Sequence, residues 1–125
     1  MTGQTPSAGP IKERILSEDI LKRDPKLAEV VRRLVEAFQP ERIYLFGSVA
    51  RGEAGPDSDY DLMVLVRDAQ EPSYRLSQQA HSLIWDLGVA ADIVVWKTDR
   101  FDRRAHLRAS LPATVLREGR LLHAA

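Results

Sequence analysis

The sequence contains no cysteine, which excludes disulfide bonds and metal sites built from thiolates. It also lacks an apolar run long enough to cross a membrane, and its N-terminus lacks the charged-then-apolar order of a signal peptide. An excess of charge is absent too, because 18 Lys and Arg residues balance 18 Asp and Glu residues. Net charge therefore favours no particular partner. Because the sequence has neither a membrane span nor a signal peptide, we expect a cytoplasmic protein with no membrane contact.

The 125 residues suit one domain and leave no room for a second of ordinary size. Residues 1–10 are rich in Gly, Pro, Ser and Thr, which predicts a disordered leader before a single domain at 11–125. The charges are unevenly placed, since acids gather in Glu53–Asp61 and arginines in the C-terminal quarter. Such a basic stretch is usually a solvated helix face, with a partner surface as the alternative and nucleic acid as the less favoured ligand.

Hydrophobic periodicity predicts an alternation of helices and strands. The predicted helices lie at 11–23, 25–38, 48–51, 72–87, 99–108 and 112–117. The predicted strands lie at 42–46, 61–66 and 90–96, and residues 121–122 form either a last short strand or a docking tail. Asp24 and Asp99 are predicted N-caps, and Gly88 is a predicted C-terminal stop. This order indicates a small α/β sheet with helices on at least one face, whereas the strand pairing stays open.

Two of these strands contain acids where packing alone would not place them. Asp59 and Asp61 are two residues apart at the entrance to an apolar strand, so both side chains point to the same face. Asp92 lies inside the apolar run AADIVVW, where a buried carboxylate costs several kcal/mol unless it is paired or bound to metal. If the two strands are neighbours, three carboxylates converge. Oxygen ligands without cysteine or paired histidines indicate Mg²⁺ or Mn²⁺ and not Zn²⁺.

The segment FGSVARG is the second candidate element of a site. A strand that ends at Gly47-Ser48 and turns directly into a helix presents unpaired backbone N–H groups. The Ser48 hydroxyl adds a donor, and Gly47 allows a phosphate oxygen to approach closely. A phosphate site beside a carboxylate site for two metal ions is what in-line phosphoryl or nucleotidyl transfer requires.

Each of these residues also has a structural interpretation. Asp59 and Asp61 could form an ordinary turn before a strand, and Asp57 is interpreted as a solvated loop residue. Asp92 could be an edge acid paired with an arginine. Arg51 could form a surface ion pair with Glu53 or a neighbour as readily as it contacts phosphate.

The residues Gly47-Ser48, ten intervening residues and then Asp59-Tyr60-Asp61 resemble the signature of the DNA polymerase β-like nucleotidyltransferase superfamily. The longer segment YLFGSVARGEAGPDSDYDLMVLV resembles its minimal nucleotidyltransferase branch, of the MntA antitoxin type. The resemblance implies a mixed sheet with flanking helices. It also implies that Gly47, Ser48 and Arg51 lie at the phosphates, and that two Mg²⁺ ions (or Mn²⁺) are held by Asp59, Asp61 and Asp92. Asp92 would also serve the acceptor hydroxyl.

From this resemblance we expect AMP transfer from ATP to a hydroxyl, with a tyrosine of a partner HEPN-domain toxin as the acceptor and an antitoxin role for the chain. Two alternatives stay open. The chain could be a binding module that neutralises its partner by contact alone. It could also modify a small molecule, as aminoglycoside nucleotidyltransferases do, through the cleft of a homodimer.

Overall fold

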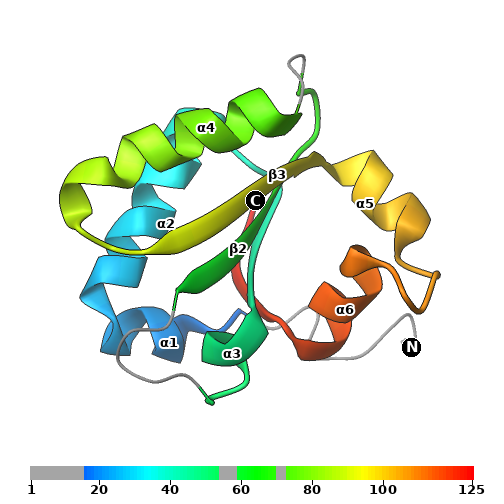
Figure 1. The fold of residues 1–125 in the computed structure, drawn as a ribbon, viewed down its shortest axis with the longest axis horizontal. Coiled ribbons are helices and arrows are strands. Elements are labelled where there is room, and N and C mark those ends of the chain that lie inside the picture. Colours follow the sequence, from blue (N-terminus) through cyan, green and yellow to red (C-terminus); the bar gives the residue numbers. More distant parts are fainter. Residues whose placement is uncertain (1–15, 54–58, 70–72) are drawn as a thin grey trace, which may run out of the picture.

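A computed structural model of the chain describes residues 16–53, 59–69 and 73–125. Its elements are α1 (Glu18–Arg23), α2 (Pro25–Phe38), β1 (Arg42–Phe46), α3 (Gly47–Ala50), β2 (Tyr60–Val66), α4 (Ser73–Ile84), the 3₁₀-helix η2 (Trp85–Leu87), β3 (Ala91–Lys97), α5 (Thr98–Arg104), α6 (Leu111–Glu118) and β4 (Arg120–Ala124). The small mixed sheet with flanking helices confirms the predicted α/β (α+β) fold class (Figure 1).

The four strands form one sheet in the order β3-β2-β1-β4. Strand β1 runs antiparallel to β2 and to β4, whereas β2 and β3 are parallel. Parallel neighbours need a crossover, and α4 provides it between β2 and β3. Residues 121–122, for which the sequence allowed a short strand or a docking tail, lie in strand β4 and pair with β1. The strand order also leaves β3, which contains Asp92, at one edge of the sheet.

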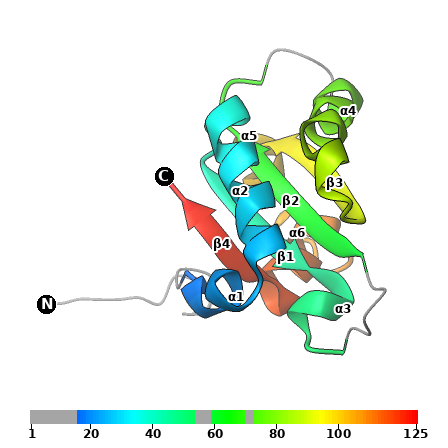
Figure 2. The ribbon, with the colours of Figure 1, turned by 90° about the vertical axis from the view of Figure 1, so that its left-hand side faces the viewer.

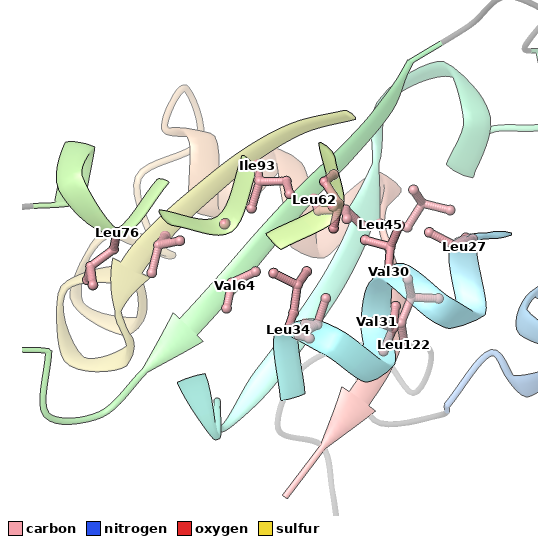
Figure 3. Close-up of a cluster of buried hydrophobic side chains, with 14 of the residues drawn as sticks. Leu27, Val30, Val31, Leu34, Leu45, Leu62, Val64, Leu76, Ile93 and Leu122 are labelled. Atoms are coloured by element: carbon pink, nitrogen blue, oxygen red, sulfur yellow. The ribbon is translucent and has the colours of Figure 1, made fainter. Parts of the chain in front are cut away.

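Buried side chains lie on both faces of the sheet, because successive strand residues point to opposite sides. Figure 2 shows α2 and α4 on one side and α5 and α6 on the other. The larger cluster joins α2 and α4 to the sheet, and Figure 3 labels these members of it: Leu27, Val30, Val31, Leu34, Leu45, Leu62, Val64, Leu76, Ile93 and Leu122. The second cluster, beneath α5 and α6, consists of Tyr44, Met63, Leu65, Phe101, Val115 and Leu121.

The ends of the helices test the predicted capping residues. Asp24 does cap α2, since its Oδ1 accepts a hydrogen bond of 3.1 Å from the backbone N–H of Leu27. Gly88 ends η2 at a φ of 66°, in the left-handed region that favours glycine. The prediction for Asp99 is wrong: α5 begins at Thr98, directly after β3, so Asp99 lies in the first turn, where its Oδ2 is 3.4 Å from Nε of Arg103.

Several predictions fall partly outside the described residues. These are the leader at 1–10, the first half of the helix expected at 11–23, the loop that contains Asp57, and the start of the helix expected at residue 72. Of the helix expected at 11–23, residues 18–23 are helical, whereas Leu16 forms a bridge with Leu121. In the described ranges no helix combines the length and apolar character needed to cross a bilayer.

Candidate active site

The register of the two parallel strands places two of the predicted acids side by side. In the β2–β3 pair Asp61 is the direct partner of Asp92, and Leu62 is the partner of Ile93. Directly paired residues point to the same face of a sheet. Leu62 and Ile93 are buried in the cluster beneath α2 and α4, so Asp61 and Asp92 lie on the opposite face.

The environment of Asp61 combines burial with the negative charges of the other two acids. The pKa of Asp61 is raised, first by burial and then by the negative charges of Asp92 and Asp59, while Arg51 lowers it. Burial and like charges both disfavour the ionised carboxylate. A cation bound among these three groups would remove the repulsion, so the donor set fits a hard divalent metal ion.

Asp92 itself differs from the sequence-based expectation. We predicted a carboxylate buried in an apolar strand, but Asp92 is exposed, and the described part of the chain has no buried polar or charged residue. The reason is the position of β3 at the edge of the sheet, with Asp92 as its second residue. Burial therefore gives no reason to expect a metal ion at Asp92. The reason that remains is that Asp92 is paired directly with Asp61 on the neighbouring strand.

Gly47 has a more specific role than the sequence suggested. Its φ is +76°, and a Cβ built at this position would lie 2.2 Å from Oδ2 of Asp61. We expected the missing side chain to make room for a phosphate oxygen. In the structure the group that occupies this space is the Asp61 carboxylate. The predicted turn and the predicted acid cluster are therefore in direct contact.

The remaining residues of the turn lie at the beginning of α3. The helix begins at Gly47, one residue before the predicted start, and Ser48 is half-buried in its first turn. Backbone N–H groups in a first helical turn have no partner within the helix, so they are available to a ligand.

Arg51 follows α3 and makes two ion pairs. Its Nε is 2.9 Å from Oε1 of Glu53, and its Nη1 is 3.0 Å from Oε1 of Glu118. The surface ion pair that we considered as an alternative is therefore present. Arg51 nevertheless remains close enough to Asp61 to lower the pKa of that carboxyl group.

The sequence analysis gave no role to the tyrosine between the two acids of the signature. The hydroxyl of Tyr60, between Asp59 and Asp61, donates a hydrogen bond to Oδ2 of Asp24. Burial and this hydrogen bond raise the pKa of Tyr60 to about 12, so the phenol keeps its proton at neutral pH. A signal was available, because an aromatic residue between two acids at the start of a strand faces the core while the acids face away.

A cavity of about 470 Å³ lies beside α3. It is bounded by α1, the start of α2, α3 and β4, and its lining includes Ile20, Asp24, Val49, Arg51 and Arg120. Its volume is in the range of small-molecule sites.

In the ranges that the structure describes, no three His, Asp or Glu side chains are already grouped closely enough to hold a metal ion.

The sequence and the fold were compared with known proteins. The family model of the nucleotidyltransferase domain matches residues 25–121, which include every candidate site residue. A segment of the chain is 43% identical over 44 residues to a bifunctional uridylyltransferase/uridylyl-removing enzyme of Pseudomonas putida (strain W619). That segment is 34% of this chain and only 5% of the enzyme.

Solved structures share the fold at lower identity. A crystal structure from Sulfolobus solfataricus, described as a nucleotidyltransferase, is 22% identical with a TM-score of 0.56 and covers 92% of this chain and 90% of its own. A mutant of the toxin–antitoxin MntA–HepT is 24% identical with a TM-score of 0.51, covering 79% of this chain and 72% of that chain. These similarities show the arrangement of helices and strands.

Proposed function

Because this chain belongs to the nucleotidyltransferase domain family, we propose that it transfers AMP from ATP to a hydroxyl group and releases pyrophosphate. In this reaction the acceptor oxygen forms a bond to the α-phosphorus, and the bond between the α-phosphorus and the bridging oxygen of the pyrophosphate breaks. The proton of the hydroxyl passes to a base, for which Asp92 is the candidate. Nucleotidyl transfer is the family's chemistry, whereas the donor, the acceptor and the residue roles are our proposal.

The observation that supports the proposal most directly is the contact of the two predicted halves of the site. Asp61 lies beside Asp92 in the strand register, and its carboxylate lies against Gly47 at the start of α3. A triphosphate held at the turn of Gly47 and Ser48 would therefore lie next to the carboxylates. Arg51 is the nearest cationic candidate for a phosphate contact.

Asp59, Asp61 and Asp92 are the proposed ligands of two Mg²⁺ ions, with Mn²⁺ as the alternative. The donor set is suitable, because carboxylate oxygens are the ligands that these ions prefer. Burial, and after it the negative charges of Asp92 and Asp59, raise the pKa of Asp61, and both effects disfavour its ionised form until a cation is bound. When bound, such ions neutralise charge that develops on phosphate oxygens and lower the pKa of an attacking hydroxyl.

The proposed acceptor is a hydroxyl group of another protein. Asp92 is exposed on an edge strand, so a large partner can approach it from solvent. The fold is similar to that of the toxin–antitoxin MntA–HepT. We therefore propose that the chain acts as an antitoxin, that its partner is a HEPN-domain toxin, and that a tyrosine of this toxin receives AMP.

The proposal is tested first by ligand binding. A ligand that binds only the folded state raises its melting temperature. Mg²⁺ with ATP should therefore stabilise the wild-type protein, and the double variant Asp59→Asn, Asp61→Asn should lose most of that shift. An equal shift in the double variant would contradict the metal assignment. Transfer is then measured with ATP labelled in the α-phosphate and, as the acceptor, the HEPN-domain toxin proposed as the partner.

A further inference from the structure

Tyr60 occupies the middle position of the Asp59-Tyr60-Asp61 segment, and its side chain lies on the face of the sheet opposite to that of Asp61. It is the first residue of β2, and its partly buried ring packs against the cluster beneath α2 and α4. Asp61, the next residue, lies on the opposite face beside Asp92. The orientation of Tyr60 therefore determines which way the neighbouring carboxylates point, because side chains alternate along a strand.

The hydroxyl of Tyr60 is held by the first turn of α2. It donates to Oδ2 of Asp24, while Oδ1 of the same carboxylate accepts from the backbone N–H of Leu27 at 3.1 Å. One carboxylate thus caps a 14-residue helix and holds the start of β2. This helix is buried against the sheet through four residues, so the anchor is rigid.

The backbone of Tyr60 is held as well. Its N–H donates to the carbonyl oxygen of Ala90 at 3.0 Å. Ala90 is two residues before Asp92. Tyr60 therefore joins three parts of the fold, which are the start of α2, the start of β2 and the segment that leads into β3. These two attachments hold Tyr60 directly before Asp61 and hold Ala90 two residues before Asp92.

We propose that Tyr60 is a positioning residue of the active site, and that its hydrogen bond to Asp24 holds Asp59 and Asp61 in the geometry that binds the metal–nucleotide complex. This inference rests on the proposed function of the site. Tyr60 does not contact the substrate in this proposal; it acts through the two carboxylates that flank it. Loss of groups that orient metal ligands typically weakens metal binding roughly 10- to 100-fold.

The test measures Mn²⁺ binding in the presence of α,β-methylene-ATP, by the loss of the free Mn²⁺ signal in electron paramagnetic resonance. Tyr60→Phe keeps the ring and removes only the hydroxyl. Asp24→Ser keeps a good helix cap, but its side chain is too short to keep the bond to Tyr60. We expect each variant to bind Mn²⁺ roughly tenfold more weakly than the wild type. The double variant should lose no more than either single variant, because both changes break the same bond.

Ile84→Val is the control for a general loss of packing, since it removes a buried methyl group from α4 and changes no hydrogen-bonding group. It should lower the melting temperature and leave Mn²⁺ binding unchanged. Wild-type affinity in Tyr60→Phe would overturn the inference, and so would losses in the two single variants that multiply in the double variant. If the wild-type protein binds neither Mn²⁺ nor the analogue, the proposed function itself fails and the inference with it.

Discussion

A Cβ atom at Gly47 would lie 2.2 Å from Oδ2 of Asp61, so the turn before α3 and the acid on β2 occupy adjoining space. The Asp61 carboxylate can turn away from an added methyl group, but it then leaves the position beside Asp92. We therefore predict that Gly47→Ala abolishes most of the stabilisation by Mg²⁺ and ATP. The measurement is the melting temperature with and without the two ligands.

Gly52 provides a control for this prediction. Its φ is also +76°, yet no described atom lies within 4 Å of a Cβ built there. Alanine in this left-handed conformation costs about 1–2 kcal/mol at either position. Gly52→Ala should thus lower the melting temperature while the ligand-induced shift persists. If Gly47→Ala also keeps the shift, the contact with Asp61 has no bearing on the site.

The raised pKa of Asp61 predicts how stability without ligand depends on pH. A carboxyl group whose folded-state pKa exceeds its unfolded value supports the fold when protonated, and this support is lost as the pH rises through the folded-state pKa. The ionised form therefore destabilises the free protein at neutral pH. We predict that Asp61→Asn raises the melting temperature at pH 7 in the absence of metal.

The pH profile separates this effect from a simple gain in packing. At a pH below the ordinary value of about 3.9 the wild-type carboxyl group is protonated, and the advantage of Asp61→Asn should disappear. Mg²⁺ with ATP should then reverse the order at neutral pH by stabilising only the wild type. An asparagine variant that is less stable than the wild type at pH 7 without metal would show that Asp61 has a structural partner at that pH.

Local patterns predicted much of this molecule correctly. Helix α2 and strand β1 have the predicted bounds, since Asp24, Pro25 and the spacing of apolar residues act within a few positions of one another. The neighbouring positions of Asp61 and Asp92 were predicted only on the condition that their strands pair. Pairing is set by the crossover of α4 and the packing of both faces, which no single segment contains.

The failures also have physical reasons. An apolar run around Asp92 suggested burial, but β3 is an edge strand, and the position of a strand in its sheet is a tertiary property. The contact of Gly47 with Asp61 and the bond of Tyr60 to Asp24 each join residues that are distant in sequence. The sequence shows which residues could form such contacts, whereas the fold determines which of these residues lie next to one another.

Arg51 allows a test of the proposed phosphate contact. Its guanidinium group bonds to Glu53 and Glu118, both at the surface, where ion pairs add little to stability. We predict that Arg51→Ala changes the melting temperature only slightly and weakens ATP binding on the order of tenfold, which is a typical effect of losing a charge-assisted hydrogen bond. Titration calorimetry with Mg²⁺ and α,β-methylene-ATP measures the affinity.

Glu118→Gln is the companion variant for Arg51. It removes the charge that holds Nη1 of Arg51 and leaves the guanidinium group in place. If Arg51 moves to a phosphate when ATP binds, this variant should bind ATP at least as tightly as the wild type. Wild-type affinity in Arg51→Ala would restrict Arg51 to a structural role.

Asp92 distinguishes catalysis from contact with a partner. Because its side chain is exposed on an edge strand, Asp92→Asn should fold normally. In our proposal Asp92 serves the acceptor, so the variant should retain most of its ATP affinity. We expect it to transfer AMP roughly a hundredfold more slowly, a typical loss for a group that acts in the transition state. Rates are measured with labelled ATP and the proposed partner toxin as acceptor.

The same variant tests the proposed antitoxin role in cells that express the proposed partner toxin. If adenylylation silences the toxin, Asp92→Asn should fail to protect those cells even though it still binds its partner, which a pull-down assay of the complex would show. Ala91→Ser changes the neighbouring residue without removing a carboxylate, so it should protect as the wild type does. Full protection by Asp92→Asn, with transfer lost in vitro, would mean that contact alone neutralises the partner.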